Sequence, residues 1–179
     1  MTTFLQLLSL DTVSCSPSVI VVTESSRFLF DSGEGIQRLC VEHRARIAKL
    51  EGVYLTRLSP ETVSGLPGLC LTAADAGRTH LAVVGPKDTT LFWDSTSHFM
   101  RRNSFEVSIS EPVVNESSST MFVAAQKYSE MTIHSIPLGQ THLCYICQTP
   151  QLAGKFDVSK AIALKIPKGD IWITLLLHF

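Results

Sequence analysis

The sequence lacks the features that would place it in several common classes of protein. No apolar run approaches the ~18–20 residues that a membrane-spanning helix needs, and no secretory signal is present at the amino terminus. The net charge of −1 excludes a polycation that binds nucleic acid over its whole surface, so any such surface has to be a local patch. We therefore expect an intracellular protein without a membrane partner.

Histidine and serine motifs that carry catalysis are also missing. The six histidines form neither an HxH nor an HxxxH pair, and no GxSxG turn is present to position a nucleophilic serine. The five cysteines are odd in number and, apart from Cys144 and Cys147, widely spread, which favours reduced thiols over a disulfide framework. Hydrolysis by a serine triad therefore has no support in the sequence.

The residues that are present predict one domain of mixed α/β class. Apolar residues make up 45 % of the 179 residues, which is enough for a substantial core. Runs rich in β-branched and apolar residues predict strands at 4–8, 19–22, 27–31, 53–56, 80–84, 105–109, 121–125, 131–138 and 143–148. Apolar spacing predicts helices at 36–50, 66–76 and 87–100. Strands thus dominate, with helices packed outside one or two sheets.

Two polar turns that follow predicted strands are the candidates for a functional site. The first, Asp31–Gly35, leads directly into a helix, and its glycines permit a tight turn. Such a turn is either a loop for a phosphate or a metal, or a purely structural connection. The second, Arg57–Ser64, follows the apolar run Val53–Thr56 and precedes the segment Gly65–Gly68. A polar loop at the carboxyl end of a buried strand is where α/β folds place ligands.

Three segments in this order resemble the tRNase Z family, the metallo-β-lactamase-fold endonucleases that remove the 3′ trailer of precursor tRNA. They are FDSGEGIQRL, VYLTRLSPETVSGLPGL and YICQTPQLAGKFDVSKAIALKIPKG. The first resembles the family's DxGEG turn, the second its LTHxHxDHxxGLPGL motif, and the third the flexible arm that clasps the tRNA. The residues that carry the first two as structural motifs are Asp31, Gly33, Glu34, Gly35, Gly65 and Gly68. The resemblance implies an α/β (α+β) fold, a metallo-β-lactamase-like αββα sandwich that is incomplete in this chain.

The chain departs from the family at the metal-ligand positions of the second motif. These positions hold Arg57, Ser59, Glu61 and Thr62. Zinc is bound by imidazole, thiolate or carboxylate groups, so only Glu61 is a competent ligand, and the permanent charge of Arg57 repels a cation. Without zinc no water is activated to attack a phosphodiester. The resemblance therefore implies a chain with no catalytic residue, no metal ligand and no cofactor of its own.

This pattern resembles the amino-terminal half of long-form tRNase Z, whose carboxy-terminal half keeps the zinc ligands. It implies a domain over 1–142, the start of the tRNA-binding arm over 143–169, and a divergent apolar tail over 170–179. In the arm, four lysines are opposed only by Asp157 and predict phosphate contacts to tRNA, although they also fit the solvated face of a surface helix. They are Lys155, Lys160, Lys165 and Lys168.

The implied role is to support the fold of the zinc-dependent catalytic half and to hold precursor tRNA, without activity of its own. The implied partners are precursor tRNA and that carboxy-terminal half, in the nucleus or cytoplasm, with the mitochondrion as an alternative. A different class of function stays open, namely a stand-alone, inactive lactamase-fold protein that acts through protein–protein contacts. A third alternative is residual metal-dependent hydrolysis.

Overall fold

The computed structural model describes residues 2–10, 17–98, 100, 104–112, 124–150, 162 and 164. Residues 1–148 form one compact unit and residues 149–179 form another. All the helices and strands given below belong to the first unit. Within the described ranges, no helix has both the length and the apolar character that a bilayer crossing requires.

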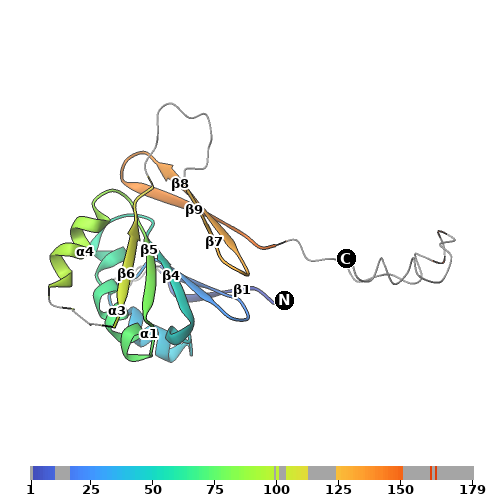
Figure 1. The fold of residues 1–179 in the computed structure, drawn as a ribbon, viewed down its shortest axis with the longest axis horizontal. Coiled ribbons are helices and arrows are strands. Elements are labelled where there is room, and N and C mark those ends of the chain that lie inside the picture. Colours follow the sequence, from blue (N-terminus) through green and yellow to red (C-terminus); the bar gives the residue numbers. More distant parts are fainter. Residues whose placement is uncertain are drawn as a thin grey trace. The chain divides into compact units, whose positions relative to one another are not determined.

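The larger of two sheets has six strands in sequence order, from β1 to β6 (Figure 1). The strands are β1 (Phe4–Ser9), β2 (Ser18–Val22), β3 (Arg27–Phe30), β4 (Leu50–Tyr54), β5 (His80–Val84) and β6 (Glu106–Ser110). The first three are antiparallel neighbours, whereas β3 to β6 pair in parallel. The carboxyl ends of four parallel strands therefore lie along one edge, and the loops after β3 and β4 meet there.

The second sheet is an antiparallel meander of three strands. They are β7 (Ala124–Lys127), β8 (Thr132–Leu138) and β9 (His142–Gln148). The strand predicted at 121–125 overlaps β7 at Ala124 and Ala125, and its first three residues lie outside the described ranges. Every other predicted strand is present within a few residues of its expected bounds.

The helices are α1 (Ile36–Glu42), the short 3-10 helix η1 (Ile47–Lys49), α2 (Pro60–Val63), α3 (Leu66–Asp75) and α4 (Thr89–Ser97). The prediction of one helix over 36–50 is wrong, because α1 ends at Glu42. Arg44 has φ of 55°, and the Ala45 N–H donates to the Cys40 carbonyl at 2.7 Å. These bonds form a Schellman ending without the usual glycine, which turns the chain back toward β4.

Alternating side chains divide the core of the six-stranded sheet between its two faces. On one face Leu29, Val53 and Val83 pack against α1 and α3. On the other, Phe28 and Tyr54 pack in a cluster with Ile133 and its neighbours in the second sheet. Since successive side chains of a strand point to opposite faces, β3 and β4 are buried on both sides. The described residues thus form three layers, namely helices, a six-stranded sheet and a three-stranded sheet.

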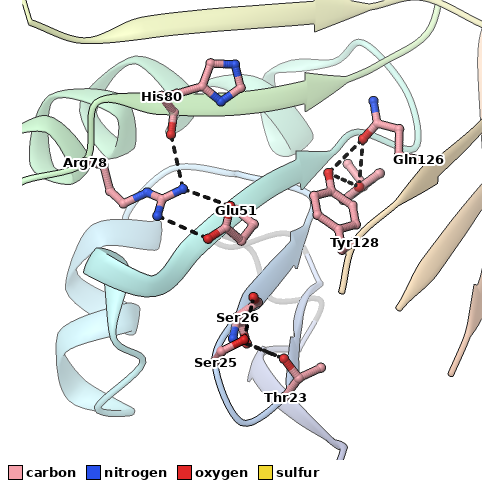
Figure 2. Close-up of polar contacts among 9 residues, drawn as sticks. Thr23, Ser25, Ser26, Glu51, Arg78, His80, Gln126 and Tyr128 are labelled. Atoms are coloured by element: carbon pink, nitrogen blue, oxygen red, sulfur yellow. Dashed lines mark hydrogen bonds and ion pairs between the residues drawn. The ribbon is translucent and has the colours of Figure 1, made fainter. Parts of the chain in front are cut away.

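Tyrosine hydroxyls link the two sheets within this second cluster. The hydroxyls of Tyr54 and Tyr128 lie 2.8 Å apart, and they donate to Gln126 Oε1 at 2.9 and 2.8 Å (Figure 2). The Tyr145 hydroxyl on β9 donates to the Leu55 carbonyl at 2.7 Å. Buried hydroxyls need such partners, so these bonds set how the second sheet packs on the first.

A carboxylate outside the core makes a further link between the sheets. Glu130, in the turn between β7 and β8, accepts hydrogen bonds from the hydroxyls of Ser25 (2.6 Å) and Thr23 in the turn between β2 and β3. The Ser25 N–H also donates to it at 3.1 Å. These donors, the Ser25 hydroxyl foremost, lower the pKa of Glu130 below its usual value.

We predict that Leu69→Ala lowers the free energy of unfolding by about 2–5 kcal/mol, because it leaves a cavity in the core. Leu69 lies on α3 and is fully buried. The matched control is Leu91→Ala on α4, where the side chain is 65 % exposed, and we expect a change within about 0.5 kcal/mol. Urea unfolding measures both, and equal losses would contradict the helix–sheet packing described here.

We predict that Glu130→Gln lowers the midpoint of thermal unfolding at pH 7 and that this difference from the wild type disappears in acid. A carboxyl whose pKa is lowered by folding stabilises the protein above its unfolded-state pKa, and this stabilisation is lost as the pH falls through the folded-state pKa. Melting curves from pH 7 down to about pH 3 test this. A difference between the two proteins that is independent of pH would show that the Glu130 charge is unimportant.

Candidate functional site

The candidate site lies where the chain leaves the carboxyl ends of β3 and β4. Asp31 follows β3, and its carboxylate accepts two bonds from Thr56, which follows Tyr54 and Leu55 at the end of β4. The Thr56 N–H donates to Oδ1 at 2.8 Å, and the Thr56 hydroxyl donates to Oδ2 at 2.8 Å. The Asp31 N–H in turn donates to the Tyr54 carbonyl at 2.9 Å. Asp31 thus fastens the two loops to each other.

The environment of Asp31 favours this structural role over that of an open base. The residue is 9 % exposed and has φ of 59°, a left-handed conformation that aspartate tolerates better than most residues. Burial raises the pKa of its carboxyl, and the bonds from Thr56 and the charge of Arg57 offset part of that effect. Both carboxylate oxygens already accept hydrogen bonds within the protein.

Three of the four positions singled out in the second motif bond to one another. Arg57 Nε donates to the Ser59 hydroxyl at 3.1 Å, and the Thr62 hydroxyl donates to the Arg57 carbonyl at 2.7 Å. Ser59 and Thr62 also form a reciprocal capping box at the start of α2. Thr62 is buried, so its hydroxyl is committed to the loop. The loop is therefore closed by its own side chains.

Glu61, the fourth position, is exposed. The pKa of the Glu61 carboxyl is lowered, mainly by a hydrogen bond from the Ser59 hydroxyl. A guanidinium, two hydroxyls committed to the loop and one exposed carboxylate do not fit zinc, which needs three or four converging nitrogen, sulfur or carboxylate ligands. Across the described ranges, no group of three or more His, Cys, Asp or Glu side chains could hold a metal ion.

The glycines of the two motifs are explained by the packing of one motif on the other. Gly65 passes so close to Gly33 that a Cβ on Gly65 would overlap the Gly33 carbonyl oxygen. The Ser32 N–H donates to the Thr62 carbonyl at 2.7 Å, and the Gly65 N–H donates to the Ser32 carbonyl at 2.9 Å. These contacts favour the structural alternative for the first turn.

The remaining motif residues lie around this contact. Gly35 is the N-cap of α1 and has φ of 76°, a left-handed conformation that favours glycine. Glu34 beside it is exposed. Gly68 lies in α3, where a Cβ would collide with the side-chain amide of Gln37. The two motifs therefore act as one packed unit rather than as two separate loops.

β9 also contributes to this site, which the sequence motifs do not indicate. The Leu143 N–H donates to the Thr56 carbonyl at 2.8 Å, and His142 forms an isolated bridge with Arg57. No local pattern could have revealed these pairs, because the partners lie in different sheets. Lys155, Lys160, Lys165 and Lys168 lie outside the described residues, as does the tail over 170–179. The domain division at 142, 143 and 170 stays a prediction.

Comparison with known families gives one match, to the tRNase Z endonuclease family over residues 4–65. This range contains both motifs up to Gly65. Among curated proteins, the chain is similar to tRNase Z TRZ4, mitochondrial, of Arabidopsis thaliana. The two are 34 % identical over 185 residues, which cover 89 % of this chain and 20 % of the plant protein.

Two solved structures show the same fold. The human short form of tRNase Z superposes with a TM-score of 0.69 and 17 % identity, over 83 % of this chain and 64 % of that one. A long-form RNase Z from yeast superposes with a TM-score of 0.64 and 24 % identity, over 75 % of this chain and 17 % of that one. At these identities the superpositions establish the fold alone.

The sequence match and the fold agree with the packed motifs at the carboxyl edge of the sheet. The chain spans about one fifth of the length of the plant relative. It has the metallo-β-lactamase fold, as expected from its motifs. Residues 4–65 match the tRNase Z endonuclease family, and the chain is similar to a plant tRNase Z over 89 % of its own length.

Proposed function

We propose that this chain is a non-catalytic, amino-terminal part of a long-form tRNase Z. Its role is to support the fold of a zinc-dependent catalytic half and to help bind precursor tRNA, while that half removes the 3′ trailer. The observation that carries the proposal is the loop Arg57–Thr62. The motif around this loop is retained, but its four side chains are a guanidinium, two hydroxyls and an exposed carboxylate.

The length relation to the relatives supports the assignment to a long form. The chain corresponds to 20 % of the plant tRNase Z and 17 % of the yeast long-form structure. Proteins of that length have room for a second domain. In this proposal zinc, the activated water and the cleavage of the phosphodiester all belong to the carboxy-terminal half, and none of them to this chain.

Precursor tRNA is the proposed ligand because the arm-like segment concentrates positive charge. Four lysines with one opposing aspartate provide ammonium groups for phosphate contacts that depend on RNA shape rather than on base sequence. The plant relative is a mitochondrial tRNase Z by name, which supports the mitochondrion as a location beside the nucleus and the cytoplasm.

A second candidate function is protein–protein contact without RNA. It is favoured by β1, which is an edge strand of the six-stranded sheet and carries exposed apolar side chains at Phe4, Leu5 and Leu7. An unpaired edge of this kind is a template for pairing with another chain. The catalytic half of the same enzyme is one such partner, so this surface is compatible with the first proposal as well.

We predict that the purified chain holds less than one zinc ion per molecule, because its ligand positions offer no converging donors. Metal analysis by plasma mass spectrometry after dialysis measures this. The matched control restores the motif with Arg57→His, Ser59→His, Glu61→Asp and Thr62→His, and it should take up more zinc than the wild type. One tightly bound zinc per wild-type chain would contradict the proposal and favour residual metal-dependent hydrolysis.

We predict that the chain shifts precursor tRNA in a gel at low salt, with a log–log salt slope of about −3 to −4 if all four arm lysines contact phosphates. Replacing Lys155, Lys160, Lys165 and Lys168 with Glu should abolish most of the binding. The introduced carboxylates repel the RNA phosphates that the ammonium groups attract. No shift by the wild type at low salt would exclude the RNA role for this chain.

The control for this experiment has to change the net charge equally. Lys155→Glu/Lys160→Glu in the arm is compared with Lys87→Glu/Lys127→Glu, two exposed lysines of the first unit. We expect the arm variant to weaken tRNA binding much more than the control. Equal losses would show that net charge, and not the arm, determines the affinity.

A further inference from the structure

A second concentration of positive charge lies in the segment between α1 and β4, which we call the basic turn (His43–Lys49). Its sequence, HRARIAK, contains a histidine and three permanent or near-permanent cations. His43, Arg44 and Arg46 are exposed, whereas Ala45 and Ile47 are half-buried and anchor the turn on the core. The Schellman ending of α1 therefore leaves both arginines at the surface.

Two cations, Lys49 of the basic turn and Arg27 of the neighbouring hairpin, contact the turn between β2 and β3. Lys49 Nζ reaches the turn between β2 and β3, where it donates to the Glu24 carbonyl at 3.0 Å. Arg27, at the start of β3, donates to the Ser26 carbonyl at 2.7 Å in the same turn. Burial, followed by the nearby charge of Arg46, lowers the pKa of Arg27.

The carboxylates around the basic turn are largely engaged with other groups. Glu42 pairs with Arg38 at 3.5 Å. Glu51 accepts a bidentate pair of bonds from Arg78 at 3.1 and 3.0 Å (Figure 2). Glu130 accepts the bonds from the β2–β3 turn described above, and Glu24 in that turn is the fourth nearby acid. Among the described residues, neither Arg44 nor Arg46 has an acidic partner in an ion pair.

The basic turn is distinct from the candidate site described above. It precedes β4, and Arg27 pairs in register with Leu50 at the amino end of the parallel strands. The loop Arg57–Thr62 follows the carboxyl end of β4. Because β4 has five residues, the two regions are separated by roughly 15 Å along the strand. The positive charge therefore lies at the opposite end of the sheet from the altered ligand positions.

We propose that the basic turn, through Arg44 and Arg46, binds the phosphodiester backbone of precursor tRNA as a contact separate from the arm lysines. This inference rests on the proposed function. A guanidinium presents a planar fork of donors that matches two phosphate oxygens, and an arginine without an acidic partner does not first have to break an ion pair. The basic turn exposes no large apolar side chain of the kind that anchors protein interfaces, which favours a polyanion over a protein partner.

The test compares Arg44→Gln/Arg46→Gln with the wild-type chain of 179 residues in binding to a fluorescent precursor tRNA between 50 and 200 mM salt. We expect about tenfold weaker binding at the lowest salt and a salt slope that is shallower by about 1.4–1.8, as two lost phosphate contacts require. The matched control is Lys87→Gln/Lys127→Gln, which removes the same charge from exposed residues outside the turn. It should change the affinity by less than about twofold.

Two further measurements make the result specific. Arg44→Lys/Arg46→Lys keeps the charge and should retain the salt slope, and melting curves should show that all variants fold. A poly-glutamate peptide, used as the probe for an acidic protein, should bind at least about tenfold more weakly than tRNA at equal salt. Equal binding of the peptide, with the same sensitivity to Arg44→Gln/Arg46→Gln, would overturn the choice of RNA.

The remaining outcomes separate this inference from the proposed function. If replacing the arm lysines weakens tRNA binding but Arg44→Gln/Arg46→Gln leaves it unchanged, the inference about the basic turn is overturned and the proposed function is not. Equal loss in the double variant and its control also overturns it, because net charge would then explain the effect. No binding of tRNA by the wild type overturns both the inference and the RNA role.

Discussion

The buried carboxylate of Asp31 is the interaction on which the arrangement of the site depends. Removing a carboxylate from water costs free energy unless hydrogen-bond donors of the protein replace the water. Here Thr56 supplies both an N–H and a hydroxyl. The pair joins the carboxyl ends of β3 and β4, and the following residues then carry the motifs into contact. Gly65 can approach Gly33 only because both loops leave the sheet from fixed positions. The scaffold thus holds itself together without any ligand.

In the proposed function, this independence lets the fold persist without metal ligands at these positions. The loop Arg57–Thr62 is closed by bonds among its own side chains, so a metal is not required to order it. Ser59 and Thr62 are good residues for a helix start, and they cap α2. A histidine at either position could not form this capping box.

Prediction from sequence was most successful where the signal is local. The β-branched run Val19–Val22 and the helix with Pro67 near its start and Gly77 after its end were found within a residue or two. The end of α1 was missed because Arg44 takes a left-handed conformation that usually signals glycine. The bonds from Tyr145 to Leu55 and from Ser25 to Glu130 span 90 and 105 residues. They depend on how two sheets pack, which no local pattern encodes.

The proposed function and the proposed basic-turn contact depend on the distribution of charge and need no chemistry at the site. The chain has a net charge of −1, yet two exposed arginines of the basic turn have no acidic partner in an ion pair within the described part of the chain. At the other end of β4 the cation Arg57 is held by Ser59 and the loop is satisfied internally. Attraction of a polyanion follows from exposed, unneutralised charge, whereas hydrolysis requires converging ligands. The proposed binding surface is therefore independent of metal ligands in the loop Arg57–Thr62, because the two depend on residues at opposite ends of one strand.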